Sequence, residues 1–345
     1  MNMLKVGIIG YGYWGPNLAS NFFDLPSSDL AAISELKQDR LQRARSLYPG
    51  VRLVEDYTEL FEMDLDAVVI STPPALHYPI ARNCLEHGLN ILVEKPMTLN
   101  SQHAQELIDL AEMRGLTLMV GHTFEYNSAV AALKQYIQSG ELGDIYYIDT
   151  ARLNLGLFQS DSNVLWDLAP HDISILLYLL GESPESVSAQ GLPCVFDKIF
   201  DVAFVNLVFP NKIQAHIHVS WLDPCKVRRV TVVGSKKMIV FNDVENEQKI
   251  KIYDKGVEVP DYTNGFGEFH CNYRSGDILI PKVRFVEPLR QECQHFLDSI
   301  TNQTQPCSDG YDGLKVVKIL EAAERSMRNG STQEWIKWER QSIAA

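Results

Sequence analysis

The sequence predicts an α/β domain followed by an α+β domain, and three observations support this prediction. Over roughly the first 120 residues, short apolar strand patterns alternate with helical patterns, which is typical of a parallel sheet with helices on both faces. After Gly121 the pattern changes, and strand patterns dominate from residue 186 to about residue 253, which indicates a large, open, mostly antiparallel sheet. A chain of 345 residues is long enough for two cores. We therefore expect two domains, residues 1–123 and 124–345.

Each predicted element of the first domain rests on a local signal. The strands are short runs rich in Val, Ile and Leu, at residues 4–9, 30–33, 65–70, 90–93 and 116–120. The first helix carries Leu18, Phe22 and Phe23 at helical spacing and ends before Pro26. Three more helices are predicted at residues 39–48, 78–86 and 101–114, where Pro49-Gly50 and Gly88 end the first two.

The second domain is predicted to begin with a helix at residues 129–139 and a long strand at residues 143–155. Another helix is expected at residues 170–180, because Pro170 suits the first helical turn and Gly181 suits a helix end. The clearest strand covers residues 213–221, where apolar and polar side chains alternate and predict one buried face. Helices return at residues 288–300 and 313–327.

Composition and charge exclude several classes of function. Lys and Arg total 31 and Asp and Glu total 44, so the net charge is −13 and nucleic acid and anionic membranes are poor partners. No apolar run approaches the roughly 20 residues of a membrane span, and the first residues do not resemble a secretory signal. Six scattered cysteines without a C-x-x-C pair fit reduced thiols in the cytoplasm. We expect a cytoplasmic protein that binds small molecules.

A glycine-rich turn separates the first predicted strand from the first helix. Gly10-x-Gly12-x-x-Gly15 allows a tight turn and a close approach to a pyrophosphate, and the following helix start offers N–H groups to it. Glu35 ends the second strand 20 residues after Gly15, where a carboxylate accepts hydrogen bonds from an adenosine ribose and repels a 2′-phosphate. The pattern predicts a dinucleotide site that favours NAD(H) over NADP(H). A glycine-rich turn without a ligand is the alternative interpretation.

Two short motifs follow neighbouring strands of the predicted parallel sheet. Thr72-Pro73-Pro74 and Glu94-Lys95-Pro96 each stand at the carboxyl end of a strand, where open α/β sheets bind ligands. We therefore expect Lys95 near a nicotinamide ring, with an ordinary surface lysine as the alternative. His77, in the turn after the first motif, is expected at the edge of the cofactor.

Asp167 and His171 are four residues apart at the start of the predicted helix, a spacing that places both on one side of a turn. Moving a proton to or from a hydroxyl requires a group that titrates near neutral pH, which imidazole does. A carboxylate beside the ring would fix its tautomer. An Asp that caps the helix and a structural His explain the same spacing.

Two further motifs carry less information. His216 and His218 share the polar face of one predicted strand, but a metal site needs a third ligand that the sequence does not identify, so no metal is predicted. Arg228-Arg229 is a candidate for contact with an acidic substrate, or else a solvated pair.

Taken in order along the chain, these motifs resemble the glucose-fructose oxidoreductase / inositol dehydrogenase / rhizopine-catabolism (Gfo/Idh/MocA) family. The resemblance rests on Gly10 to Gly15 with Pro16-Asn17-Leu18, Thr72-Pro73, His77, Glu94-Lys95-Pro96, Gly121-His122, Asp167-x-x-x-His171-Asp172, Glu287-Pro288-Leu289-Arg290 and Asp309-Gly310-x-x-Gly313. Residues 14–18, 152–156 and 163–166 are similar to members found with polysaccharide and nucleotide-sugar biosynthesis enzymes. One departure is Ala169-Pro170, where many members carry glycines.

The resemblance implies a Rossmann domain, a second domain whose open sheet forms homodimers or homotetramers, and hydride transfer between a nicotinamide and a ring carbon of a sugar, cyclitol or nucleotide sugar. Lys95 would contact the reacting hydroxyl, His171 would act as acid and base, and Asp167 would position the substrate or Lys95. Two alternatives keep the dinucleotide site: a tightly held cofactor used for internal redox, as in epimerisation, elimination or aldose–aldose transfer, and a non-catalytic dinucleotide sensor.

The full set of expected contacts combines the residue patterns with the resemblance. The expected cofactor contacts are Gly10, Gly12, Tyr13, Trp14, Gly15, Glu35, Thr72, Pro73, His77, Glu94, Lys95 and His122. The expected substrate contacts are Lys95, Arg152, Trp166, Asp167 and His171.

Overall fold

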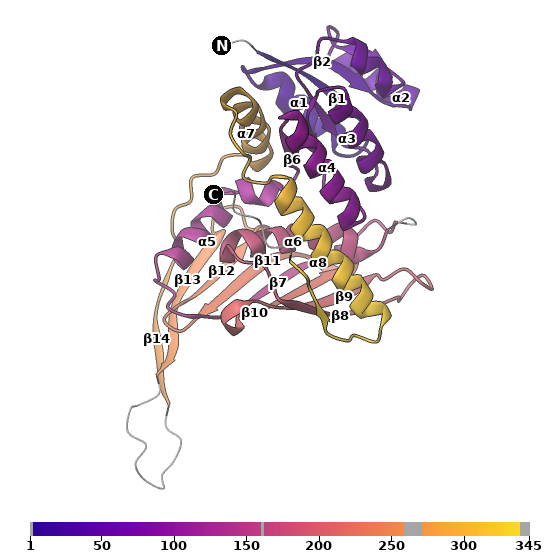
Figure 1. The fold of residues 1–345 in the computed structure, drawn as a ribbon. Coiled ribbons are helices and arrows are strands. Elements are labelled where there is room, and N and C mark those ends of the chain that lie inside the picture. Colours follow the sequence, from indigo (N-terminus) through magenta and orange to yellow (C-terminus); the bar gives the residue numbers. More distant parts are fainter. Residues whose placement is uncertain (1–2, 160–161, 259–270, 339–345) are drawn as a thin grey trace. The chain divides into compact units, whose positions relative to one another are not determined.

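The computed structural model describes residues 3–159, 162–258 and 271–338. The chain divides into two compact units, Met1–Asn127 with Val286–Glu321, and Ser128–Phe285 with Ala322–Ala345. Figure 1 shows the elements of both units. Over the described ranges, none of the helices combines the length and apolar character that a membrane span requires.

A six-stranded, all-parallel sheet forms the centre of the first unit, in the order β3-β2-β1-β4-β5-β6. Its strands are β1 (Leu4–Ile9), β2 (Ser28–Ser34), β3 (Arg52–Val54), β4 (Ala67–Ile70), β5 (Asn90–Val93) and β6 (Leu118–Val120). The connecting helices are α1 (Gly15–Asp24), α2 (Gln38–Leu47), α3 (His77–Glu86) and α4 (Ser101–Arg114), with 3-10 turns η1 (Tyr57–Glu62), η2 (Pro74–Leu76) and η3 (Thr123–Tyr126). The predicted parallel sheet is confirmed, and its order reverses between β1 and β4, where open sheets bind ligands.

The central strands are apolar because both of their faces are covered. Every residue of β4 is buried, and alternate side chains enter two different clusters. Val68 and Ile70 pack in the cluster that α3 and α4 cover, whereas Val69 packs in the cluster that α1 covers. Continuous apolar runs in the sequence therefore mark strands buried on both sides.

Helix α7 (Pro288–Asn302) belongs to the first unit, although we expected it in the second domain. Its Leu289, Cys293 and Phe296 pack in the same cluster as Val6, and the Phe296 ring meets the Phe22 ring edge-on at 6.4 Å between centroids. The expected boundary at residues 123/124 therefore missed the return of Val286–Glu321. Helical periodicity shows which side of a helix is buried but not which core receives it.

A nine-stranded sheet forms the second unit, in the order β14-β13-β12-β11-β7-β10-β9-β8-β15. Its strands are β7 (Ile145–Leu155), β8 (Ser186–Leu192), β9 (Val202–Val208), β10 (Gln214–Ser220), β11 (Leu222–Gly234), β12 (Met238–Asn242), β13 (Ile250–Glu258), β14 (Asn272–Leu279) and β15 (Glu334–Trp335). Only the β7–β10 pair among these described strands is parallel, so the predicted, mostly antiparallel sheet is confirmed.

Helices α5 (Ser128–Gln138) and α6 (Val164–Leu180) cover one face of this sheet (Figure 1). In β10 the apolar residues Ala215, Ile217 and Val219 are buried, whereas His216 and His218 on the other face are partly exposed. The alternation read from the sequence thus sets the face that meets α6. A 3-10 turn, η4 (Pro210–Lys212), lies between β9 and β10, and the last helix, α8 (Gly310–Arg328), includes the division between the units at Glu321.

Helix α6 begins at Val164, not at residue 170 as expected. The Asn163 side chain starts it by accepting hydrogen bonds from the backbone N–H groups of Leu165 and Trp166, at 3.0 and 3.3 Å. Pro170 therefore lies inside the helix. The Asn163 cap thus determines where the helix begins, and α6 contains Pro170 although proline usually disfavours a helix interior.

Candidate cofactor and catalytic sites

The glycine-rich turn requires glycine at two positions. Gly10 has a φ of +95°, and a Cβ there would lie 2.8 Å from the carbonyl oxygen of Ser71. A Cβ at Gly15 would lie 2.3 Å from the carbonyl oxygen of Gly10. Both distances are too short for a side chain, so the backbone is packed as tightly as a pyrophosphate-binding turn needs, and α1 begins directly after it. These residues fit a dinucleotide.

Glu35 is fixed at the end of β2. Its side chain is 8% exposed, and its two carboxylate oxygens accept hydrogen bonds from the backbone N–H groups of Tyr11 and Lys37, at 2.8 and 3.0 Å. The guanidinium of Arg40 lies 3.3 Å from the same carboxylate and 3.4 Å from the place where a Cβ of Gly12 would be. The carboxylate predicted to meet the ribose therefore has a set orientation, and Arg40, which we did not single out from the sequence, borders both it and the turn.

Beyond the glycines, the turn carries two aromatic rings. Tyr13 is 81% exposed and Trp14 is 39% exposed, and the two rings meet edge-on with centroids 5.9 Å apart. Exposed rings beside a dinucleotide turn can pack against a bound ligand, which is the role expected of both.

His77 links two loops at the carboxyl edge of the sheet. One ring nitrogen lies 2.8 Å from the carbonyl oxygen of Pro96 and the other 2.9 Å from that of Thr72. The side chain is 1% exposed, and burial lowers the pKa of His77. The ring thus holds the loop at Thr72 and Pro73 against the loop that follows Lys95, and its expected place at the edge of the cofactor stays a prediction.

Lys95 stands at the end of β5 beside a buried carboxyl group. The Glu94 carboxylate accepts a hydrogen bond from the backbone N–H of Lys95 at 3.2 Å, and the Lys95–Pro96 peptide bond is cis. Burial raises the pKa of Glu94 to about 7, although the charge of Lys95 opposes this shift. A Cβ at Gly121 would lie only 3.2 Å from the carboxylate, so a glycine at this position leaves room for the Glu94 side chain.

Two further buried groups of the first unit lie close to this edge. His122 is 1% exposed, and burial lowers its pKa to about 3, with a smaller effect of the Lys95 charge. Its imidazole is therefore neutral at neutral pH. Glu292 of α7 is also 1% exposed, and burial together with the nearby Glu94 raises its pKa well above the usual value. Glu292 was not singled out from the sequence, because it is nearly 200 residues from Lys95 in a segment expected in the other domain.

In the second unit, α6 carries Asp167 and His171 one turn apart. The Asp167 carboxylate accepts a hydrogen bond from the indole N–H of Trp221 at 2.9 Å, which orients it. Trp166 is 8% exposed and its indole N–H donates to Glu324 at 2.9 Å, so its ring packs inside this unit. Asp167 and His171 thus lie one helical turn apart, as expected, whereas the Trp166 side chain is buried.

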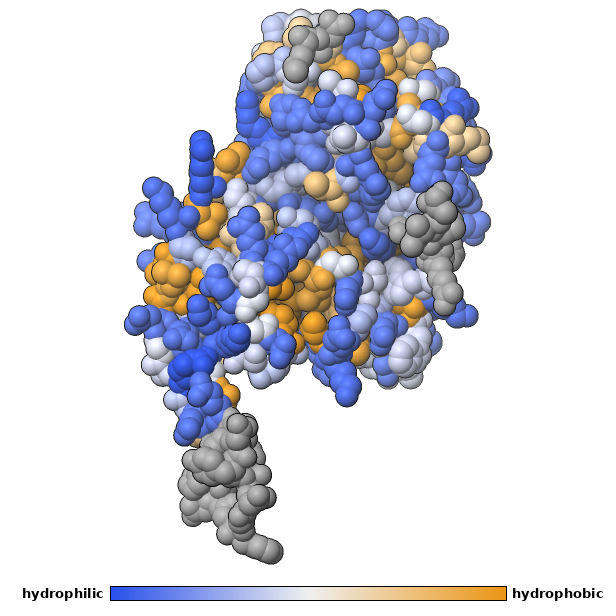
Figure 2. Space-filling view, turned by 60° about the vertical axis from the view of Figure 1, so that its left-hand side comes forward, coloured by the Kyte–Doolittle hydropathy of each residue, from blue (hydrophilic) through white to orange (hydrophobic). Residues whose placement is uncertain are grey.

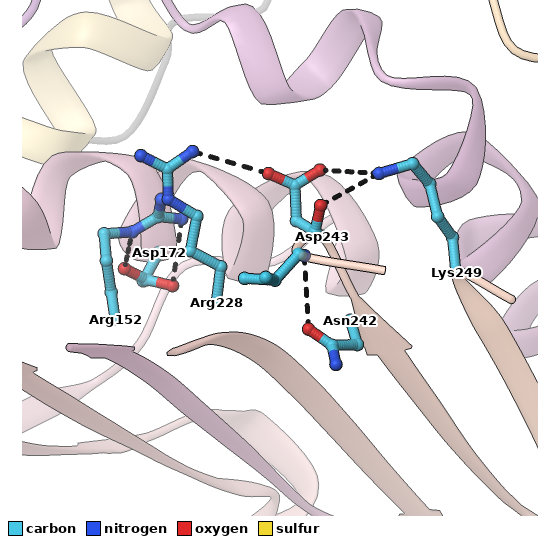
Figure 3. Close-up of polar contacts among 7 residues, drawn as sticks. Arg152, Asp172, Arg228, Asn242, Asp243 and Lys249 are labelled. Carbon is cyan, nitrogen blue, oxygen red and sulfur yellow. Dashed lines mark hydrogen bonds and ion pairs between the residues drawn. The ribbon is translucent and has the colours of Figure 1, made fainter. Parts of the chain in front are cut away.

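Arg152 forms a buried ion pair with the residue after His171. Its Nε donates to Asp172 at 2.7 Å and its Nη2 to the other carboxylate oxygen at 3.4 Å (Figure 3). The two side chains are 7% and 2% exposed. The pair ties α6 to β7, and the expected contact of this guanidinium with substrate stays a prediction. No local pattern could reveal this partner, since 20 residues separate the two.

Residues 3–159, 162–258 and 271–338 hold no cluster of three or more His, Cys, Asp or Glu side chains able to bind a metal ion. His216 instead lies 2.9 Å from the Asn206 side chain, and the His218 ring stacks on Phe204 with centroids 4.4 Å apart.

The chain matches two family descriptions and many related proteins. Residues 4–122 match the description "Oxidoreductase family, NAD-binding Rossmann fold", and residues 130–240 match "GFO/IDH/MocA C-terminal domain". An uncharacterized oxidoreductase of Escherichia coli, YdgJ, is 30% identical over 72% of this chain and 74% of its own length. The chain belongs to the Gfo/Idh/MocA family of oxidoreductases.

Two characterised members of the Gfo/Idh/MocA family are similar over nearly the whole chain. UDP-N-acetylglucosamine 3-dehydrogenase of Acidithiobacillus ferrooxidans is 26% identical over 91% of this chain and 94% of its own. Its solved structure superposes with a TM-score of 0.77 at 25% identity, covering 95% of this chain and all of that one. scyllo-Inositol 2-dehydrogenase (NAD(+)) of Bacillus subtilis is 26% identical over 95% of this chain and 94% of its own.

Membership of this family confirms that the chain is an oxidoreductase with an NAD-binding Rossmann domain. The first matched segment contains the glycine-rich turn, Glu35, Lys95 and His122, and the second contains the acid–imidazole pair of α6. Each group of candidate residues therefore lies inside the part of the chain that the corresponding family description covers.

Proposed function

We propose that this Gfo/Idh/MocA oxidoreductase transfers a hydride between NAD(H) and a ring carbon of a sugar, cyclitol or nucleotide sugar. The observation that carries the proposal is the position of Lys95, at the carboxyl end of a strand in the same parallel sheet that holds the dinucleotide turn. The relatives named above act on a cyclitol and on a nucleotide sugar, which supports the substrate class. A role in polysaccharide or nucleotide-sugar biosynthesis stays a prediction.

In the proposed reaction, one side chain stabilises charge and another transfers a proton. When bound, the nicotinamide accepts or returns the hydride. The Lys95 ammonium stabilises negative charge that develops on the substrate oxygen, and the His171 imidazole takes up the hydroxyl proton during oxidation and returns it during reduction. Asp167, oriented by Trp221, positions the substrate or Lys95. Positioned acid–base groups of this kind contribute about 100-fold to 10,000-fold in rate.

The preference for NAD(H) over NADP(H) is part of the proposal. The Glu35 carboxylate has fixed geometry and accepts hydrogen bonds, which suits two ribose hydroxyls and disfavours a 2′-phosphate. Its remaining contact, Arg40, lies on the side toward Gly12. A comparison of turnover with NAD+ and NADP+ tests this directly, and equal kcat/KM for the two would contradict it.

The experiment that tests the activity measures NADH formation by Lys95→Ala, His171→Ala and a control, Lys5→Ala. The probes are NAD+ with scyllo-inositol, myo-inositol and UDP-N-acetylglucosamine. Lys5 lies at the start of β1 and pairs with Asp64 at the surface, so its loss should leave turnover unchanged. Each of the other two variants should lose at least about 100-fold in kcat/KM on the best probe. A loss below about tenfold, or about 1.4 kcal/mol, would exclude the residue from the reaction.

The same measurement distinguishes the alternatives. NADH that accumulates in proportion to oxidised substrate supports a dissociating cofactor, whereas turnover without free NADH supports internal redox on a retained one. Cofactor binding without turnover on an extended panel of sugars would support a sensor.

We also propose that the open face of the nine-stranded sheet joins copies of this chain into a homodimer or homotetramer. Phe204, His216 and His218 share that face with Tyr147, which is 47% exposed. Figure 2 shows apolar side chains, in orange, gathered at the surface of the second unit. Analytical ultracentrifugation of Phe204→Asp tests the proposal: the variant should sediment as a smaller species, and an unchanged distribution would contradict this interface.

A further inference from the structure

Two arginines of the second unit stand directly opposite each other on neighbouring strands. Arg228 of β11 is the antiparallel partner of Arg152 of β7, so both side chains project from the same face. This is the face that α6 covers, because Arg152 contacts Asp172 of α6. Like charges at such positions repel, and the sheet keeps them only where carboxylates compensate.

The two arginines differ in how closely a carboxylate pairs with them. Arg152 has a buried carboxylate with two hydrogen bonds, at 2.7 and 3.4 Å. Arg228 has an ion pair with Asp243 at 3.6 Å, and over the described ranges no hydrogen bond from its guanidinium is found. Asp243 is shared, since it also accepts a hydrogen bond from Lys249 at 3.3 Å (Figure 3). The N–H donors of Arg228 are therefore available to another acceptor.

The cluster carries a surplus of positive charge in an acidic protein. Among the described residues, the ion pairs of this cluster join three cations, Arg152, Arg228 and Lys249, to two carboxylates, Asp172 and Asp243, so these five groups sum to 3 − 2 = +1, whereas the whole chain has −13. The Arg228 side chain is 42% exposed, which leaves it open to a ligand, whereas that of Lys249 is 15% exposed. Figure 3 shows the Arg228 guanidinium between the Arg152–Asp172 pair and Asp243.

The position of the cluster connects it with the proposed chemistry. Asp172 directly follows His171 in α6, and strand partners in an antiparallel pair lie about 5 Å apart. Arg228 is thus one strand away from the arginine that ties down the turn carrying His171. A planar guanidinium with five donors suits two oxygens of a phosphate or a carboxylate, and its loose ion pair with Asp243 keeps it oriented until an anion arrives.

We propose that Arg228 binds an anionic group of the substrate, a phosphate or a carboxylate, and so selects charged sugars over neutral ones. This inference rests on the proposed function, since it assigns the substrate of the same site. It narrows the sugars, cyclitols and nucleotide sugars considered above to those that carry an anion. Arg152, buried and paired, is left with a positioning role.

The test measures binding of four probes to the full chain saturated with NADH, by isothermal titration calorimetry. N-acetylglucosamine is the neutral probe; UDP and UDP-N-acetylglucosamine carry a diphosphate, and glucuronate carries a carboxylate. The variants are Arg228→Gln and Arg228→Lys, with Arg229→Gln as the matched control. Arg229 is the next residue, faces the other side of the sheet and pairs with Asp149 at 3.9 Å.

We expect wild type to bind at least one anionic probe about tenfold more tightly than the neutral one, a difference of about 1.4 kcal/mol. Arg228→Gln should abolish this difference, Arg228→Lys should retain part of it because a charge remains, and Arg229→Gln should leave it intact. The diphosphate and carboxylate probes show which anion is recognised. Equal wild-type affinity for all four probes, or equal effects of the Gln variants at 228 and 229, would overturn the proposal.

A result that rejects the anion site at Arg228 can be distinguished from a result that rejects the proposed function. Binding is measured without turnover, so a loss of anion selectivity together with Lys95-dependent NADH formation from a neutral cyclitol rejects only the anion site. If Arg228→Gln does not fold, Arg228→Lys still decides the question, because a site that needs a planar fork must lose affinity for the anionic probe when only a point charge is left.

Discussion

The buried Arg152–Asp172 pair offers a quantitative test of how α6 is held on the sheet. In Asp172→Asn the side chain keeps its shape but loses its charge, so the buried Arg152 loses the carboxylate that it pairs with. The two side chains are only 7% and 2% exposed, and one of the two hydrogen bonds is 2.7 Å long. Breaking one partner of such a pair costs about 3–5 kcal/mol, because the remaining ion cannot recover its hydration.

Urea unfolding followed by tryptophan fluorescence measures the decrease in the free energy of unfolding. Trp166 and Trp221 lie in the second unit, where Trp166 is part of α6 and Trp221 donates to it, so their emission reports this part of the chain. As a control, Glu141→Gln removes one partner of the exposed Lys237–Glu141 pair of the same unit and should lose at most about 1 kcal/mol.

A double variant separates charge from packing. Arg152→Met with Asp172→Leu removes both charges and fills much of the same space, so it should be more stable than Asp172→Asn alone. A loss of less than about 1 kcal/mol in Asp172→Asn would refute the reasoning, since it would mean that water or another group already solvates the guanidinium. A double variant as unstable as the single one would show that packing, not charge, dominates.

Three other predictions follow from the same structure. Gly15→Ala should weaken NAD+ binding by at least about tenfold, because its Cβ would lie 2.3 Å from a carbonyl oxygen, whereas Gly50→Ala, with no atom within 4 Å of its Cβ, should bind normally in the same titration. Glu292 should contribute a fall in the unfolding free energy as the pH rises above the ordinary pKa of a glutamate, since the folded protein retains a proton on Glu292 that the unfolded chain releases; in urea unfolding between about pH 5 and pH 8, the unfolding free energy of Glu292→Gln should therefore fall less, or rise more, with pH than that of wild type, and an identical slope would contradict the assignment. Native protein should react with a thiol reagent at Cys194, which is exposed, but not at Cys84 until it unfolds, because burial raises the pKa of the Cys84 thiol to about 12; peptide mapping after labelling checks both.

Local patterns in the sequence were sufficient for the parallel sheet and for the NAD-binding Rossmann domain. Apolar runs mark strands buried on both faces, and the turn from Gly10 to Gly15 followed by Glu35 can be recognised because a dinucleotide turn needs small residues and a carboxylate at set spacings. The alternation in β10 likewise predicts the face that meets α6. In each case the burial or turn geometry constrains residues that are close together in the chain, so the local residue pattern predicts it.

Other features could not be predicted from local sequence patterns. Helix α7 could be recognised as a helix but not assigned to the first unit, and α6 was expected to begin near Pro170 because the Asn163 cap was not recognised. The internal partners of Arg152 and His77 could not be predicted either, since sequence spacing does not indicate them.

By itself, then, the sequence determined the fold class, the dinucleotide turn and the family. Only the tertiary structure decided which charged groups are buried in internal ion pairs and which stay partly exposed. Arg152 and Arg228 look alike in the sequence, yet Asp172 buries one and Asp243 holds the other loosely. The reason is that electrostatic pairing depends on distance and burial, and both are set by contacts between residues far apart in the chain.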